Sequence, residues 1–210
     1  MPVYDQVNLL DVAGPMEMFF WAGIETVLVA QNPGTLQFMS GLTFSVERDF
    51  HGVGACDALW VPGGDPPALK AIIEDRSETY LNFLRDMHKE VRITASVCEG
   101  AMLLAAAGLL DGYEATTHWQ FLPCYARYFP KVKIAPGHPR FHLDRDRLTG
   151  GGISSGLDEA LKLIELITGD KKRADGARLT TQYFPDPVPP NIPDVTDCPL
   201  QLSRLPPVRA

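Results

Sequence analysis

The sequence lacks the features that mark exported, membrane-spanning and nucleic-acid-binding proteins. Its longest apolar run, Ala101 to Leu110, is about half as long as a bilayer-spanning helix needs to be. No positively charged start followed by an apolar stretch opens the chain, so we expect no export signal. The formal net charge is −7 and lysine and arginine form no cluster, which argues against nucleic acid or an anionic membrane as partner. We therefore expect a small-molecule ligand.

Cysteine and histidine are also scarce and scattered. The four cysteines, Cys56, Cys98, Cys124 and Cys198, lie far apart and form no CxxC pair. A chain of 210 residues is long enough to bury a core without disulfide bonds. We therefore expect reduced thiols and a cytoplasmic location. Because no cysteines or histidines stand at metal-ligand spacing, we expect no metal site.

Length and composition predict one globular domain followed by an irregular end. The 45% hydrophobic and 21% charged residues are typical of globular proteins, and no internal repeat is present. Eight of the 18 prolines fall after residue 184, where neither a helix nor a central strand can persist. We predict a single domain over residues 1–184 and a Pro-rich extension over 185–210, either an extended strap or a flexible end.

The alternation of strand-like and helix-like segments predicts the fold class. Short β-rich runs at Thr26–Ala30, Ala58–Val61 and Val91–Val97 are separated by segments typical of helices or loops. This pattern is that of parallel βα units. It predicts an α/β protein with a mostly parallel central sheet between two helical layers.

Four helices are predicted from apolar spacing. An amphipathic helix contains Leu81, Phe83, Leu84 and Met87, and Ala101–Leu110 is too apolar to face water and must be central. Apolar residues at helical spacing run over Leu157–Thr168, with Gly169 placed to end that helix. A short helix around Lys171–Gln182 follows.

Cys98 stands where a buried strand passes into a buried helix, in Ala95-Ser-Val-Cys98-Glu-Gly100. A side chain at such a turn projects from the carboxyl edge of the sheet, where open α/β folds bind ligands. The helix amino end favours a thiolate and predicts a depressed pKa for Cys98, which is the property of a nucleophile. The alternative is a small buried residue that only packs.

Two Gly-rich turns and a carboxyl group are predicted to meet Cys98. The turns, at Gly63-Gly64 and Gly150-Gly151-Gly152, let main-chain amides approach an anionic intermediate, although such turns also serve as plain connectors. Asp11 precedes a Gly14-Pro15 turn into a helix, so it either caps that helix or acts as a general acid/base beside the thiol.

One further candidate is His118 in Ala115-Thr-Thr-His118-Trp119, where core packing competes with a role in the site. Cys56, Cys124 and Cys198 have no comparable setting and are expected to be inert.

Taken together, these segments resemble the ThiJ/PfpI superfamily, a class I glutamine amidotransferase-like group. They are most similar to its isonitrile hydratase branch. The matching motifs, in chain order, are Leu-Leu-Asp11-Val-Ala-Gly-Pro, Val-Pro-Gly63-Gly64, Ala-Ser-Val-Cys98-Glu-Gly-Ala, Ala-Gly-Leu-Leu-Asp-Gly and Ala-Thr-Thr-His118-Trp119. The resemblance spans about Leu9 to Tyr183 and implies a flavodoxin-like three-layer α/β/α sandwich.

The resemblance also implies an activity. That branch adds water to isonitriles to give N-substituted formamides, without metal or organic cofactor, and its members are usually homodimers with the site near the subunit interface. By position, Cys98 would attack the isonitrile carbon to form a thioimidate, and Asp11 would be the acid/base. Gly63, Gly64, Glu99, His118, Gly151 and Gly152 would line the substrate or oxyanion pocket.

The chain departs from the branch at Glu99, where Thr is expected, and in a shortened amino-terminal strand at Pro2-Val3-Tyr4. A Glu99 carboxylate that points into the site would disfavour the thiolate, whereas one that points to solvent would be harmless. The protease and glyoxalase branches often have His in the place of Glu99, so peptidase activity is not expected. Two alternatives without isonitrile turnover stay open. One is a ligand-sensing domain like those that precede DNA-binding helices in transcription regulators, and the other is a redox-responsive protein with an oxidisable Cys98.

Overall fold

A four-stranded central sheet organises the structure, a computed structural model that describes residues 1–51, 53–185 and 194–205. Its strands, in spatial order, are β5 (Ala58–Val61), β6 (Ile93–Ser96), β10 (Arg147–Gly150) and β9 (Phe141–Asp144). The first three are parallel and β9 is antiparallel to β10. The prediction of a mostly parallel sheet is confirmed.

Three short strand pairs surround this sheet. They are the parallel pair β1 (Pro2–Val3) and β2 (Val29–Ala30), the antiparallel pair β3 (Gly34–Gln37) and β4 (Thr43–Val46), and the parallel pair β7 (Glu114–Ala115) and β8 (Lys133–Ile134). The β-rich run at 58–61 forms a strand as predicted. The runs at 26–30 and 91–97 form shorter strands than predicted.

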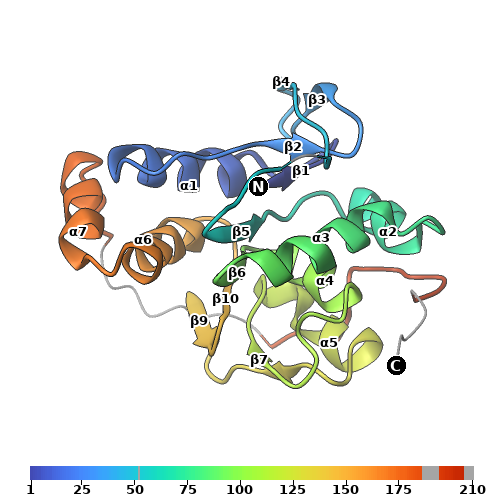
Figure 1. Ribbon diagram of the computed structural model, residues 1–210. Helices are drawn as coiled ribbons and strands as arrows, with labels where there is room; N and C mark the ends of the chain where they lie inside the picture. The colour runs from blue at the N-terminus through green and yellow to red at the C-terminus, as the bar shows by residue number, and fades with distance from the viewer. Residues whose placement is uncertain (52, 186–193, 206–210) are drawn as a thin grey trace.

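Helices cover both faces of the sheet (Figure 1). One layer contains α1 (Leu9–Trp21), α6 (Ser155–Thr168) and α7 (Lys171–Thr180). The other contains α2 (Pro66–Glu74), α3 (Thr79–Glu90), α4 (Gly100–Ala106), η1 (Trp119–Phe121) and α5 (Leu122–Tyr128). The helices predicted at 157–168 and 171–182 are confirmed to within two residues. The one predicted at 101–110 ends earlier, at Ala106.

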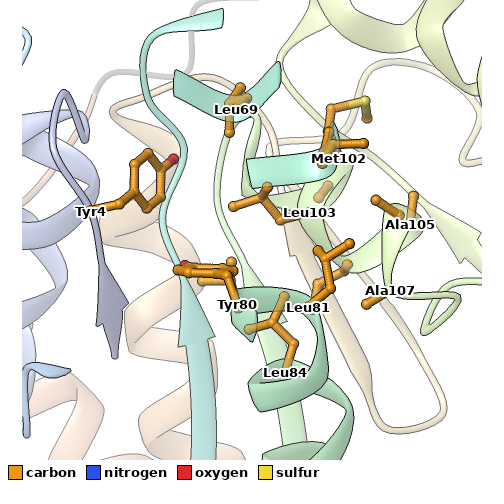
Figure 2. Packing of buried hydrophobic residues seen from close by; sticks show 14 of the residues in the cluster. Tyr4, Leu69, Tyr80, Leu81, Leu84, Met102, Leu103, Ala105 and Ala107 are labelled. Carbon is orange, nitrogen blue, oxygen red and sulfur yellow. The ribbon is translucent and has the colours of Figure 1, made fainter. Parts of the chain in front are cut away.

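Alternating side chains of β5 show why there are three layers. Leu59 and Val61 belong to the hydrophobic cluster under α2, α3 and α4, whereas Trp60 belongs to the cluster under α1 and α6. Successive residues of a strand point to opposite faces, so each helical layer has its own core. In the first cluster, Leu69, Tyr80, Leu81, Leu84, Met102 and Leu103 gather beside Tyr4 (Figure 2).

Helix α1 differs from the predicted turn at Gly14-Pro15, because it begins at Leu9 and runs through both residues. Its amino-terminal cap is Asn8, whose side chain accepts the Leu10 N–H at 3.0 Å. Pro15 has no N–H to donate to the Asp11 carbonyl one turn earlier, which would leave that buried carbonyl unpaired. The indole N–H of Trp60 donates to it instead, at 3.1 Å. The helix therefore continues through the proline.

The described part of the C-terminal extension returns to the core without helix or strand. Leu200 is fully buried, and a disulfide bond joins Cys198 to Cys124 of α5 across a sequence separation of 74 residues. The expectation of four reduced thiols is therefore wrong for this pair, whereas Cys56 and Cys98 are free. Residue spacing could not reveal the pairing because it depends on where the tail returns. The rest of the predicted extension, 186–193 and 206–210, lies outside the described residues.

Within residues 1–51, 53–185 and 194–205, no helix has the length and apolar character that crossing a bilayer requires. The prediction of a cytoplasmic location, which rested partly on reduced thiols, stays a prediction.

Replacing Trp60 by Phe should lower the free energy of unfolding by more than the lost packing, because the buried Asp11 carbonyl loses its donor. An unpaired buried carbonyl costs about 1–3 kcal/mol. In a Pro15→Ala background the new N–H at position 15 can donate to that carbonyl, so Trp60→Phe should cost less there. Urea unfolding of the four proteins in this cycle measures the difference. An equal cost in both backgrounds would contradict the assigned role of the indole.

Candidate functional site

Cys98 occupies a strained turn between β6 and α4. Its φ is 56°, in the left-handed region that residues other than glycine rarely adopt. Two hydrogen bonds hold this conformation: the Cys98 N–H donates to the Gly151 carbonyl at 2.9 Å, and the Thr117 hydroxyl donates to the Cys98 carbonyl at 2.8 Å. Gly100 is needed in the next turn because a Cβ there would overlap the Val61 carbonyl. The sulfur position is therefore fixed by the backbone.

Two carboxyl groups lie against the Cys98 thiol. One ligand atom each of Asp11, Cys98 and Glu99 lies within 4.8 Å of the other two, and all three residues are buried. Asp11 comes from the first turn of α1, and Glu99 directly precedes α4. Both carboxyl groups lie close enough to the thiol to shift its pKa. The structure therefore brings together the two residues predicted as catalytic.

The Asp11 side chain does not cap α1. Its Oδ2 accepts the main-chain N–H of Gly63 at 2.9 Å, its Oδ1 has no hydrogen-bond partner, and the residue is 0% exposed. Of the two predicted alternatives, capping is wrong because Asn8 caps α1.

The Gly63-Gly64 turn packs directly on these acids. A Cβ on Gly63 would lie 2.5 Å from Glu99 Oε2 and 2.6 Å from the Glu99 nitrogen, and one on Gly64 would lie 2.6 Å from the Gln6 carbonyl oxygen. A main-chain hydrogen bond also links Gly64 to the Glu99 carboxyl group. Only glycines allow this close approach.

The predicted depression of the Cys98 pKa is wrong. Burial raises the pKa of the Cys98 thiol well above its ordinary value, and the Asp11 and Glu99 charges raise it further. Helix α4 has only seven residues, and a main-chain N–H from Ile153 lowers the pKa by less than burial raises it. Desolvation and the two neighbouring acids therefore decide the direction of the Cys98 pKa shift, rather than the helix amino end.

The acids themselves are also shifted. Burial raises the pKa of Asp11 well above its ordinary value, and the neighbouring Glu99 charge adds to this. Burial raises the pKa of Glu99 too, opposed by its hydrogen bonds to Cys98 and to the main chain. Asp11 therefore favours its protonated, proton-donating form.

The remaining predicted residues line the approach to Cys98. The His118 Nδ1 is 4.0 Å from Glu99 Oε1, and burial lowers the His118 pKa, which favours a neutral ring. A Cβ on Gly152 would overlap the His118 ring. The Gly151 N–H donates to the Arg140 carbonyl at 2.8 Å, so Gly151 offers Cys98 its carbonyl oxygen.

A cavity of about 410 Å³ opens beside this cluster. Thr117, Gly151 and Ile153, which all contact Cys98, are among its lining residues. The full lining is Leu10, Thr116, Thr117, His118, Trp119, His138, Pro139, Arg140, Gly151, Gly152, Ile153, Ser154 and Ser155. A second cavity of about 460 Å³ lies near Met1 and Cys56 and is lined by none of the predicted site residues. The first cavity adjoins the main chain of the Cys98 turn, and Cys98, Asp11 and Glu99 themselves are not among its lining residues.

Three residues of the site were missed from the sequence: Thr117, Ile153 and Glu159. Glu159 is 0% exposed, neither of its oxygens has a hydrogen-bond partner, and its carboxyl group lies against Gly150. Burial raises its pKa well above the ordinary value, and the nearby Asp11 charge raises it further. Its spacing of three and four residues from Gly156 and Leu163, both buried, was the signal that it faces inward.

Within the described residues, Asp11, Cys98 and Glu99 form the one cluster whose ligand atoms could reach a common metal ion. A thiol and two carboxyl groups this close together can equally exchange protons with one another. The expected absence of a metal stays a prediction.

The fold and the site define a class: α/β proteins with a cysteine at a strained strand-to-helix turn beside a buried carboxyl group. The chain belongs to the DJ-1/PfpI family, whose match covers residues 1–164. The resemblance noted from the motifs is confirmed.

Two kinds of relative were found. Isonitrile hydratase from Pseudomonas putida is 32% identical over 88% of this chain and 78% of that protein. The transcriptional regulator GlxA of Rhizobium meliloti is 30% identical over 76% of this chain but only 46% of the regulator. The crystal structure of a ThiJ/PfpI family protein from Pseudomonas syringae superimposes with a TM-score of 0.80 at 32% identity, covering 91% of this chain and 76% of that one.

Because Glu159 keeps its proton to a higher pH in the folded protein than in the unfolded chain, it should make stability fall as pH rises. Above the ordinary Glu pKa of about 4.3, the loss is about 1.4 kcal/mol per pH unit until the folded pKa is reached. The free energy of unfolding of Glu159→Gln, relative to that of the wild type, should therefore increase with pH at about that slope. Urea unfolding over a pH series measures this difference. The exposed Glu90→Gln is the matched control and should run parallel to the wild type. A Glu159→Gln curve that is also parallel would contradict the buried protonated acid.

Proposed function

We propose that the protein adds water to an isonitrile and releases an N-substituted formamide. The observation that carries this proposal is the Cys98 sulfur within 4.8 Å of two buried carboxyl groups, next to a cavity. An isonitrile carbon must be attacked by a nucleophile and protonated at the same atom, so it needs a thiol and an acid within reach of one point. The similarity to isonitrile hydratase over 88% of the chain supports the same reaction.

In the proposed mechanism, Cys98 Sγ bonds to the terminal carbon of R–N≡C as its S–H proton passes to a neighbouring base, while the Asp11 carboxylic acid gives its proton to that carbon. The product is a thioimidate, R–N=CH–S–Cys98, and an Asp11 carboxylate. Asp11 then takes a proton from the water that adds to the same carbon, and the C–S bond breaks to release R–NH–CHO. The raised pKa of Asp11 suits the first step because it favours the proton-donating form of the acid.

The surroundings of the sulfur would select the substrate. Leu10, Trp119 and Ile153 supply apolar surface to the cavity, which suits an uncharged alkyl or aryl group on the isonitrile nitrogen. The proposed reaction requires no metal and no organic cofactor.

A ligand-sensing role is the second candidate, and the similarity to the regulator GlxA favours it. In such a role the same cavity would bind a small molecule, and Cys98 would perform no turnover. A redox-responsive role for Cys98 likewise involves no isonitrile hydration. Catalytic turnover separates the proposed function from both.

Purified protein should convert an alkyl isonitrile such as cyclohexyl isonitrile to its formamide, followed by gas chromatography. Cys98→Ala should abolish the reaction. Asp11→Asn should lower kcat by about 10²–10⁴-fold, the range for loss of a general acid or base. Cys56→Ala removes the other free thiol and should leave the rate unchanged. Wild-type protein with no turnover on several alkyl and aryl isonitriles would eliminate the hydratase proposal.

We also propose that the protein is a homodimer. At the adjoining ends of α1 and α7, Phe20, Trp21 and Leu179 are 68%, 50% and 68% exposed, and Phe184 just beyond α7 is 62% exposed. Exposed apolar groups of this size mark a protein interface more often than free surface.

Sedimentation velocity should show a dimer at micromolar concentration, and the double variant Trp21→Ser/Leu179→Ser should be monomeric because two large apolar contacts are lost. A matched double substitution on the distant β3–β4 pair, Thr35→Ser/Thr43→Ser, should leave the dimer intact. A monomeric wild type would refute the proposed dimer.

A further inference from the structure

Glu99 contacts the reacting sulfur as directly as Asp11 does. One of its carboxyl oxygens lies within 4.8 Å of the Cys98 sulfur, and the residue is only 8% exposed. The Gly63 turn presses on its main chain and its carboxyl group, so that the side chain is confined beside the thiol. The mechanism above gives Glu99 no task, although the thiol must lose its proton to something as it attacks.

Building on the proposed function, we propose that Glu99 is the general base for the thiol. Its carboxylate takes the Cys98 proton as the S–C bond forms and returns it to sulfur when the C–S bond breaks. Asp11 transfers the protons to and from the substrate carbon, the water and the nitrogen. Each of the two acids thus transfers a different set of protons.

The surroundings assign the two roles in this order. Asp11 is 0% exposed and its Oδ1 has no hydrogen-bond partner, whereas Glu99 is 8% exposed and interactions with the thiol and the main chain oppose the effect of burial on its pKa. Burial raises the pKa of Asp11 well above its ordinary value, and the Glu99 charge helps to raise it. Glu99 is therefore the first of the pair to ionise, and its charge keeps Asp11 protonated.

The other titratable groups facing Glu99 are neutral. From the segment after β1, Tyr4 donates its hydroxyl to the Pro62 carbonyl at 3.2 Å, and burial raises its pKa. His118, preceding η1, has its pKa lowered by burial. No cation therefore competes with the thiol for the Glu99 carboxylate among these groups.

The proton transfers balance over one catalytic cycle. The resting site holds Cys98 as a thiol, Glu99 as a carboxylate and Asp11 as a carboxylic acid. Formation of the thioimidate moves the sulfur proton to Glu99 and the Asp11 proton to the substrate carbon. Addition of water returns a proton to Asp11, which passes it to nitrogen and takes the hydroxyl proton as the carbonyl forms. The sulfur leaves with the proton held by Glu99, and the resting state is restored.

Glu99→Gln tests this proposal because two roles for Glu99 predict opposite effects on kcat/KM. Loss of a general base lowers it, whereas loss of a group that only opposes ionisation of Cys98 does not. As the base, Glu99 supplies about 10²–10⁴-fold, so kcat/KM for an isonitrile at neutral pH should fall by at least tenfold. The acid limb of the pH profile, set by ionisation of Glu99, should disappear. If Glu99 only opposed ionisation of Cys98, the substitution would lower the thiol pKa and activity would rise or stay equal. That result would overturn the proposal.

Alkylation of Cys98 by iodoacetamide, followed by peptide mass spectrometry, tests the base without any isonitrile. The wild type should show two rises with pH, one when Glu99 ionises and one when the second proton leaves the Cys98–Glu99 pair. Glu99→Gln should show a single rise, at lower pH than the second wild-type rise. A single rise in both proteins would overturn the proposal. If isonitrile turnover is absent but the two-step profile is present, the hydratase function fails while the base survives.

Two further variants control the experiment. Glu99→Asp keeps a carboxylate and should recover part of the turnover and the two-step profile, which a purely structural role for the glutamate side chain would not give. The exposed Glu90→Gln removes the same charge at a distance and should match the wild type. Should Glu99→Gln unfold, as judged by circular dichroism, the two-step profile of the wild type and its retention in Glu99→Asp still decide the proposal.

Discussion

The structure depends on one contact: a buried thiol held between two buried carboxyl groups. Cys98, Asp11 and Glu99 lie within 4.8 Å of one another in a setting that excludes most water. Three acidic groups cannot all lose their protons there, because desolvation and mutual repulsion oppose each charge. The site therefore stores protons, and its chemistry depends on which group holds them at each step. A depressed thiol pKa is unnecessary if the proton can pass directly to a neighbouring carboxylate.

Features far apart in the sequence build this contact. The strained backbone of Cys98 sets the sulfur, Gly63 leaves space for the acids, and α1 delivers Asp11. The proline within α1 would leave the Asp11 carbonyl unpaired, and the Trp60 indole from β5 completes it. The same residue thus joins the site through its carboxyl group and the sheet through its carbonyl. Stability and function share these contacts, which explains why buried polar groups persist in an otherwise apolar core.

The sequence was sufficient for the fold class and for placing Cys98 with Asp11, because strand-to-helix junctions and Gly-rich turns are local patterns. The family resemblance put Glu99 and His118 in the same pocket, although the direction of the Glu99 side chain stayed open. The sequence failed where the answer depended on three-dimensional surroundings. The pKa of Cys98 is raised mainly by burial. The Cys124–Cys198 disulfide depends on the path of the C-terminal tail. The continuity of α1 depends on the indole of Trp60, 45 residues beyond Pro15. Glu159 was missed because glutamate side chains are rarely fully buried, so one in a helix is expected to face solvent.

The most direct test of this account is the protonation state of Cys98 at neutral pH. An infrared difference spectrum between the wild type and Cys98→Ala should contain the S–H stretching band of one thiol, and the matching ultraviolet difference spectrum should lack thiolate absorption. Thiolate absorption that disappears in Cys98→Ala, with no S–H band, would show that the two carboxyl groups do not hold the sulfur in its protonated form.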